Sequence, residues 1–194
     1  CLDEAGKYLI DKYTIKYLPS VSVIPFLRVV PDAKRRLLGI CNQSSNLPGM
    51  DNLVFSNLEL EEIHSVEQNM VIFNSGISKY KLSEIIGEFN YLHFICHSNI
   101  NPLPPIQLQL IIGNYLGESG LLTIGDILEL EIDARLVVLS ACETGAGEVS
   151  DGDEITSLAR AFLLAGSSSV IYSLWQVNDE STAFLMGRFY KYLK

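Results

Sequence analysis

One ten-residue run sets the architecture of this chain: Leu136-Val137-Val138-Leu139-Ser140-Ala141-Cys142-Glu143-Thr144-Gly145. Its first half consists of branched apolar residues, a pattern typical of a strand that is buried on both faces in a parallel sheet. Its second half is small, polar and rich in glycine, and it contains a cysteine. Open α/β sheets bind their ligands beyond the carboxyl ends of the strands, so Cys142 is a candidate functional residue.

The rest of the chain alternates apolar runs with amphipathic segments. We predict a strand pair over 7–18 and further strands at 37–41, 71–73, 91–96, 106–112 and 170–175. We predict helices over 21–28, 57–69, 79–89, 123–130 and 155–165, and a last helix capped by Asn178 or Asp179 that runs through Leu193. Thr123 is expected to cap the helix over 123–130, and Gly166 is expected to end the helix over 155–165. Loops are expected at 42–50, 99–105 and 145–153, and a turn at 117–120.

This alternation predicts an α/β fold with a mostly parallel sheet and helices on both faces, plus an N-terminal β-hairpin. In the helix over 57–69, Leu58, Ile63, Val66 and Met70 are assigned to the apolar face. Glu59 is assigned to the polar face with the other acids. A length of 194 residues suits a single domain over 1–194. The sequence begins without methionine, so we expect a piece of a longer protein.

Composition excludes several classes of protein. A net charge of −9 argues against direct nucleic-acid binding, because a phosphate-backbone binder needs clustered basic residues and the densest group here is Lys34-Arg35-Arg36. No apolar run is long enough to span a membrane. The four cysteines show no CxxC spacing, which argues against a zinc site or a disulfide framework and favours a reducing, cytoplasmic setting. We expect no metal and no cofactor.

A histidine is the natural partner for Cys142. Of the three histidines, His64, His93 and His97, only His97 lies at the end of a predicted strand, and we assign His93 to the core. An imidazole can take the proton of a thiol or stabilise the thiolate, and backbone N–H groups after the strands can hold an oxyanion. Gly145 and Gly147 would let a substrate approach closely. The alternative is that Cys142 is a small buried hydrophobic residue.

The sequence resembles the CHAT domain, a caspase-like cysteine peptidase domain usually found with tetratricopeptide repeats. The residues that carry the resemblance run through nearly the whole chain. They are Tyr8-Leu9, Tyr17-Leu18-Pro19-Ser20-Val21-Ser22, His93-Phe94-Ile95-Cys96-His97, Leu121-Leu122-Thr123, Val137 through Gly145, Leu158 through Gly166, Ser173-Leu174-Trp175-Gln176-Val177 and Phe189-Tyr190.

The resemblance implies a caspase-like three-layer sandwich and endopeptidase chemistry on a protein or peptide substrate. Cys142 would be the nucleophile and His97 the general base and acid. The backbone N–H groups of Cys142 and Ser98 would form the oxyanion hole. The family usually has Gly where this chain has Ser98, and a side chain there could hinder an approaching substrate. The resemblance also implies regulation by a repeat domain or an activating partner protein, which in some family members is an RNA-guided effector.

Candidate residues for a substrate pocket follow from their position near Cys142. Glu143, Asp151 and Asp153 could form an acidic pocket that selects Arg or Lys. We favour the simpler interpretation, in which these acids are solvated and Asp153 caps the next helix. Trp175 and Gln176, at the end of a later strand, are alternative pocket walls, although Trp175 could equally pack in the core.

Two other functions remain open. Ser98 in place of Gly is compatible with a catalytically inactive caspase-like module that binds other proteins. A small-molecule hydrolase on an α/β sheet is a third possibility, but the chain has no GxSxG or GxxxxGK motif.

Overall fold

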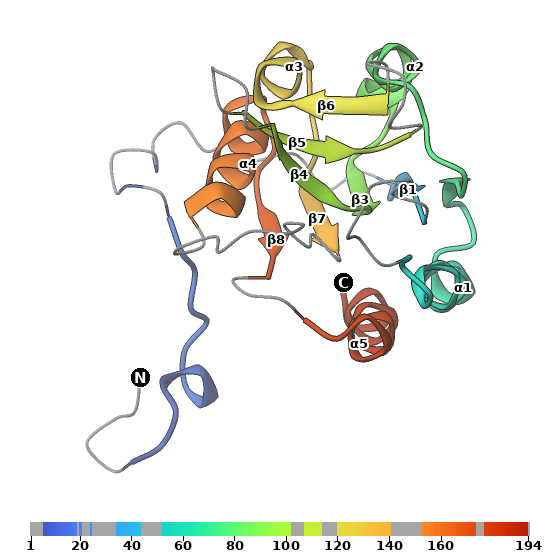
Figure 1. Cartoon of the computed structure of the whole chain (residues 1–194). Helices are drawn as coiled ribbons and strands as arrows, with labels where there is room; N and C mark the ends of the chain where they lie inside the picture. Colours follow the sequence, from blue (N-terminus) through green and yellow to red (C-terminus); the bar gives the residue numbers. More distant parts are fainter. Residues whose placement is uncertain are drawn as a thin grey trace.

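The computed structural model of the chain is shown in Figure 1. It describes residues 6–18, 20, 24, 34–43, 52–101, 107–113, 120–140, 153–173 and 177–193, and of 99–101, 107 and 153–156 only the backbone.

A five-stranded parallel sheet forms the centre of the molecule. Its strands are β1 (Leu37–Cys41), β2 (Val71–Phe73), β3 (Tyr91–Ile95), β7 (Leu136–Ser140) and β8 (Val170–Tyr172), in the order β2-β1-β3-β7-β8. Every residue of β1, β3 and β7 is buried. The sequence prediction of a parallel sheet built from continuous apolar runs is therefore confirmed.

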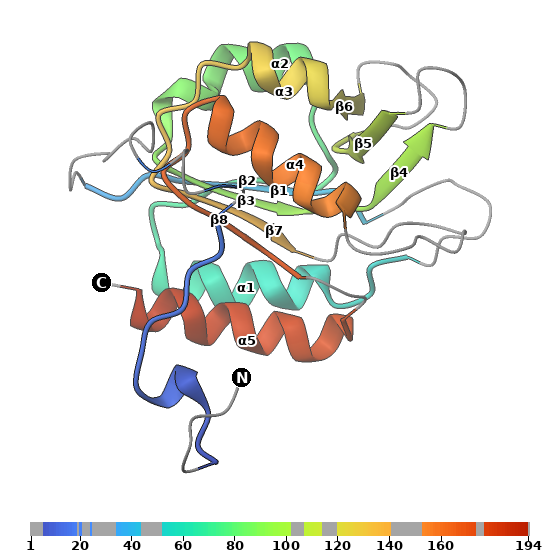
Figure 2. The same ribbon diagram turned by 90° about the vertical axis from the view of Figure 1, so that its left-hand side faces the viewer.

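Helices cover both faces of this sheet and give three layers (Figure 2). On one face α1 (Ser56–Val66) packs against α5 (Asp179–Tyr192). On the other face lie α2 (Lys79–Ile85), α3 (Ile124–Glu129) and α4 (Asp153–Leu164). The fold class predicted from the sequence, a caspase-like α/β sandwich, is confirmed.

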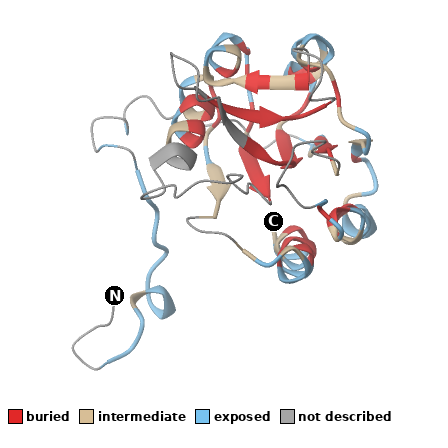
Figure 3. Ribbon diagram, in the orientation of Figure 1, coloured by how far each residue is buried: buried red, intermediate tan, exposed pale blue. Residues whose placement is uncertain are grey.

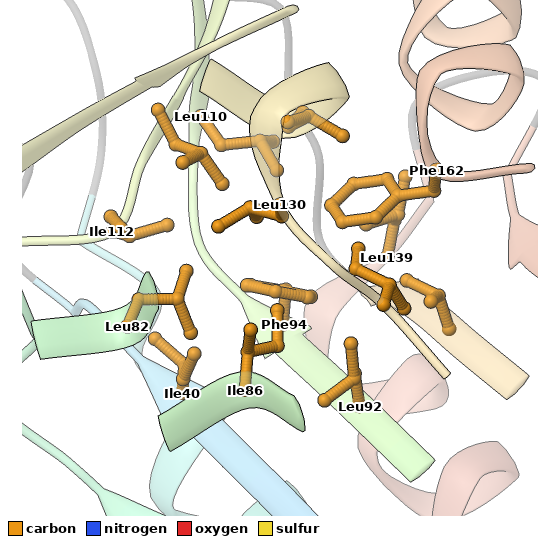
Figure 4. Packing of buried hydrophobic residues seen from close by; sticks show 14 of the residues in the cluster. Ile40, Leu82, Ile86, Leu92, Phe94, Leu110, Ile112, Leu130, Leu139 and Phe162 are labelled. Atoms are coloured by element: carbon orange, nitrogen blue, oxygen red, sulfur yellow. The ribbon is translucent and has the colours of Figure 1, made fainter. Parts of the chain in front are cut away.

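Each face of the sheet has its own apolar core, because alternate side chains of a strand point to opposite faces. Leu92, Phe94, Val137 and Leu139 belong to the larger core under α2, α3 and α4, where Phe94 contacts Phe162 with ring centroids 5.5 Å apart (Figure 4). A smaller core contains Tyr91, Ile95, Leu136 and Val138 from the same strands and lies under α1 and α5. Buried residues follow these two cores, while the outer faces of the helices are exposed (Figure 3).

A second, antiparallel sheet extends from the carboxyl end of β3. It consists of β4 (Ser98–Asn101), β5 (Gln107–Ile111) and β6 (Leu121–Thr123), in the order β4-β5-β6. The strand predicted over 106–112 is confirmed by β5. The loop predicted over 99–105 is wrong in its first part, because residues 99–101 pair with β5 as part of β4.

Helix ends follow the predicted capping residues. The Thr123 side chain accepts a hydrogen bond from the backbone of Asp126 and caps α3, and Asn178 caps α5 in the same way through Ser181. Gly166 follows α4 with a φ of 121°, a conformation that favours glycine. The helix predicted over 79–89 is α2 followed by a 3₁₀ turn, η3 (Ile86–Glu88).

The predicted N-terminal strand pair is wrong. Within the described residues 6–18 the regular structure consists of a 3₁₀ turn, η1 (Leu9–Asp11), and a single bridge residue, Tyr8, and no strand forms. The residues there have a strand-like composition, but pairing needs a partner strand as well as a pattern. Other predicted segments lie outside the described residues, namely the helix over 21–28 apart from Ile24, the loop residues 44–50 and 145–152, and the turn residues 117–119.

Candidate active site

The predicted catalytic residues follow two neighbouring strands. β3 and β7 pair in parallel, and their register places Ile95 opposite Ser140. His97 follows Ile95 by two residues, and Cys142 follows Ser140 by two. Because parallel strands end at the same edge of a sheet, this register directs both chain segments toward one edge.

Several predicted site residues lie outside the described part of the chain. These are Cys142, Glu143, Asp151, Trp175 and Gln176. Asp153 begins α4, and only its backbone is described. Of the predicted dyad and oxyanion hole, the structure therefore describes His97 and Ser98.

His97 lies at the point where the chain passes from the parallel sheet to the antiparallel sheet. Its backbone carbonyl accepts a hydrogen bond from the N–H of Ile111, with N and O 2.9 Å apart, so β5 holds its backbone in place. The His97 side chain is completely buried, with an exposed fraction of 0%. A substrate would reach this ring only after the surrounding residues had moved.

Ser98 has the backbone direction that the predicted oxyanion hole needs. His97 and Ile111 form a hydrogen-bonded antiparallel pair, and Ser98 pairs with Leu110 at the next position. Hydrogen-bonded and non-hydrogen-bonded pairs alternate in antiparallel sheets, so the N–H of Ser98 points away from β5. β4 lies at the edge of its sheet, so this N–H does not face another strand of that sheet.

The Ser98 side chain points toward the protein interior. It is completely buried, and residues opposite each other in a sheet share a face. Its partner Leu110 belongs to the larger core. Ser98 also begins a β-strand, whose extended backbone any residue can adopt. The side chain at 98 therefore lies among interior residues in this arrangement.

His93 is a core residue with two buried partners. Its Nε2 lies 2.9 Å from Glu59 Oε1 on α1, and its Nδ1 lies 3.1 Å from the Tyr190 hydroxyl on α5. All three side chains are at most 1% exposed. The assignment of His93 to the core is confirmed. The assignment of Glu59 to the polar face of its helix is wrong, because the buried face of α1 consists of Ser56, Glu59, Leu60 and Ile63.

This network joins residues that are far apart in the sequence. Glu59 and Tyr190 lie 34 and 97 residues from His93, and nothing local indicates either contact. Burial raises the pKa of Tyr190 far above its ordinary value, and the charge of Glu59 is the second cause. The Tyr190 hydroxyl therefore stays neutral. With a proton on Nε2, His93 can donate to Glu59 and accept at Nδ1 from the Tyr190 hydroxyl, an arrangement that we assign from these partners.

The other described thiols are poor nucleophiles. Cys41, at the end of β1, and Cys96, after β3, are both completely buried. Burial raises the pKa of Cys41. A hydrogen bond with Ser56 lowers this pKa, while the nearby Glu59 carboxylate raises it further, and the net shift is upward. A thiol with a raised pKa holds little reactive thiolate, which makes Cys41 a poor nucleophile. The complete burial of Cys96 keeps its sulfur away from reagents.

Ser140 is the last residue of β7 and precedes Cys142 by two positions. Its hydroxyl is buried and has no hydrogen-bond partner in the described part of the chain. A buried polar atom of this kind is uncommon, and here it stands two positions before the predicted nucleophile in the sequence.

The described residues contain no cluster of three His, Cys, Asp or Glu side chains that could hold a metal ion. None of the helices in this part of the chain has the length and apolar character needed to cross a bilayer.

Comparison with known proteins identifies the family. Over 73 residues the chain is 38% identical to mouse tetratricopeptide repeat protein 28, an alignment that covers 38% of this chain. Over 95 residues it is 37% identical to the human protein of that name, which covers 49% of this chain. Each alignment spans 3% of the relative's own length. The CHAT domain family matches residues 1–194, the whole chain. This chain therefore belongs to the CHAT domain family.

Proposed function

We propose that this domain is a cysteine endopeptidase in which Cys142 is the nucleophile and His97 the general base and acid. The observation that carries the proposal is the parallel pairing of β3 with β7, in which Ile95 lies opposite Ser140. This register directs the two segments that carry the thiol and the imidazole, each two residues further on, toward the same edge of the sheet, which supports the dyad. Family membership adds support, since CHAT domains are caspase-like peptidase-type domains.

The reaction follows from the chemistry of these groups. His97 takes the proton of the Cys142 thiol, and the thiolate attacks the carbonyl carbon of the scissile peptide bond. The backbone N–H groups of Ser98 and Cys142 stabilise the resulting oxyanion. The imidazolium gives its proton to the leaving amine as the C–N bond breaks and a thioester forms. A water molecule, deprotonated by His97, then hydrolyses the thioester and restores the thiol.

Substrate choice in this proposal depends on residues near Cys142. Glu143, Asp151 and Asp153 are the acidic candidates, and a pocket that they formed would select a basic residue before the scissile bond. Trp175 and Gln176, which follow β8, provide pocket walls. Since β8 is the neighbour of β7, its carboxyl end lies at the same edge of the sheet.

Regulation by a partner is the second part of the proposal. The mouse and human relatives are named for tetratricopeptide repeats. We infer that this domain acts beside such repeats, and that a protein bound to them controls access to the buried His97. The complete burial of that ring supports this view, because a substrate cannot touch it without a rearrangement.

The dyad is tested by a thiol-reactive peptide probe and a peptide-library cleavage assay on the protein with its flanking regions. Cys142→Ala is expected to abolish cleavage and probe labelling. His97→Ala should lower the cleavage rate at least 10²-fold, about the usual contribution of a general base. His64→Ala, at an exposed histidine of α1, is the matched control and should leave the rate unchanged. Cleavage that persists in Cys142→Ala would refute the proposal.

A catalytically inactive interaction module is the second candidate, and the complete burial of His97 favours it. In this case Cys142 would react with the thiol-reactive probe no faster than a free thiol does, and His97→Ala would not change the labelling rate. Labelling of Cys142 that depends on His97 would exclude this candidate.

A further inference from the structure

The N-terminal arm, which we define as residues 7–18, exposes an unusual number of large apolar side chains. Their exposed fractions lie between 40% and 81%. They are Tyr8, Ile10, Tyr13, Ile15, Tyr17 and Leu18. In Figure 1 the arm runs along one side of the domain, and its turn η1 lies apart from the body. Contiguous apolar exposure on this scale marks an interaction site, since single exposed apolar residues are ordinary but a series of them is not.

The arm has the pattern of one face of a β-strand. Tyr13, Ile15 and Tyr17 alternate with Thr14 and Lys16. In an extended chain the three apolar side chains would project from one face and the two polar side chains from the other. Aromatic and β-branched residues are also those that favour strands. The arm therefore has a strand sequence, but in the described structure it has no sheet to join.

The central sheet has an open edge on the same side of the molecule. β8 pairs with β7, and among the described residues no strand lies beyond it. Val170, Ile171 and Tyr172 are only partly buried, whereas β1, β3 and β7 are buried throughout. In Figure 1 the arm and β8 lie to the left of β1, and in Figure 2 the arm passes in front of β8. The strand order places β2 at the opposite edge of the sheet. Unpaired edge strands readily accept a strand from another chain.

Charge favours a second copy of this chain as the partner. The arm contains Lys7, Lys12 and Lys16 against Asp11, which gives a net charge of +2. The whole chain carries −9, so the residues outside the arm carry −11. A basic arm is attracted by an acidic body, and the body of a second copy provides both that charge and the open edge.

We propose that residues 13–17 add to the β8 edge of a second copy as a sixth strand, and that the two copies exchange arms reciprocally. Backbone hydrogen bonds along the edge provide the pairing. The apolar side of the arm covers the partly buried Val170 and Tyr172, which pack against the larger core. Because both copies give and receive an arm, the contact closes as a twofold dimer. This proposal does not depend on the peptidase proposal.

The experiment is sedimentation equilibrium on the 194-residue chain and two variants that add the same charge to adjacent positions. Ile15→Asp places the charge on the apolar side of the arm, and Thr14→Asp places it on the polar side. The wild-type chain is expected to dimerise. Ile15→Asp should raise the dimer dissociation constant by about tenfold or more, whereas Thr14→Asp should change it by less than about threefold.

Hydrogen exchange on the same samples tests where the arm binds. In the dimer the amides of 13–17 and of 170–172 should both be protected, and dilution should remove the protection from both. A monomer at all concentrations would overturn the proposal. A dimer that Ile15→Asp and Thr14→Asp weaken equally would overturn it as well. A monomer in which the amides of 13–17 are protected from exchange would also overturn the proposal, because the arm would then pair within its own chain.

Discussion

At the scale of single residues, the buried carboxylate of Glu59 is the least expected feature of the molecule. One of its oxygens accepts from His93, and the other, Oε2, has no hydrogen-bond partner among the described residues. A carboxylate this deeply buried is costly unless it is paired. His93 compensates for part of that cost, and Tyr190 in turn satisfies the second nitrogen of the ring. Three residues from three elements thus depend on one another for their hydrogen bonds.

This dependence predicts a ranked series of variants. Tyr190→Phe removes one hydrogen bond and should lower the free energy of unfolding by about 1 kcal/mol. Glu59→Leu leaves the His93 Nε2–H buried without an acceptor and should cost more, about 1–3 kcal/mol. Glu59→Gln is the matched control, because its amide oxygen can still accept from His93. Urea unfolding measures all three, and a Glu59→Leu variant as stable as Glu59→Gln would show that the hydrogen bond contributes nothing.

Residue by residue, the sequence allowed part of the candidate site to be predicted. His97 and Ser98 could be located because an apolar strand ends just before them, and His93 could be assigned to the core because it lies within that strand. The contacts of His93 could not be predicted, because Glu59 belongs to a helix whose buried face was misassigned. The acids of α1 suggest a polar face, yet the face with Glu59 packs on the sheet, where His93 provides its partner.

At the scale of elements, predictions succeeded where local signals suffice and failed where pairing is distant. Continuous apolar runs predicted β1, β3 and β7, and capping residues predicted the starts of α3 and α5. Residues 98–101 were not predicted as a strand, since Ser-Asn-Ile-Asn has little strand character, and β4 exists because β5 pairs with it. The arm shows the reverse case, a strand pattern without a partner strand in the described chain.

Helix α3 provides a prediction at this scale. Asp126 accepts hydrogen bonds from Thr123 and from Lys79, whose Nζ lies 2.8 Å from Oδ1. Burial tends to raise the pKa of Asp126, but the hydrogen bonds from Lys79 and Thr123 outweigh it and the pKa is lowered. A lowered pKa adds stability above the unfolded-state pKa of about 3.9, and that stability is lost as the pH falls through the folded-state value.

Asp126→Asn should therefore destabilise the domain at neutral pH by about 1 kcal/mol, in the range of other helix caps. The difference from the wild type should shrink as the pH falls below about 4, because the wild-type carboxyl is then protonated as well. Urea unfolding at a series of pH values measures this difference. Glu84→Gln, which removes an exposed i,i+3 ion pair with Lys81, is the control and should have little effect at any pH. A difference that stays constant down to pH 2 would contradict this account of Asp126.

At the scale of the whole molecule, one side chain joins the two sheets. Asn42 follows β1, and its backbone N–H donates to Ile95 at the end of β3, at 3.0 Å. Its side-chain Nδ2 donates to the carbonyls of Ile111 and Gly113, at 2.9 and 2.8 Å. Ile111 in turn donates to the carbonyl of His97. Asn42 is almost completely buried, so it connects the parallel sheet to the strand that holds the His97 backbone.

Removing this connection should loosen the antiparallel sheet relative to the parallel one. Asn42→Ala leaves two buried carbonyls without their donor and should cost about 1–3 kcal/mol of unfolding free energy. Asn42→Asp should cost more, because it replaces the donor by a carboxylate that faces two carbonyl oxygens. Hydrogen exchange of the β5 amides should accelerate in both variants. Asn90→Ala removes the side-chain hydrogen bonds to Lys34 and Arg36 near the amino ends of β1 and β3, so it should leave β5 exchange unchanged. Equal acceleration of β5 exchange in Asn90→Ala and Asn42→Ala would mean that Asn42 only stabilises the domain as a whole.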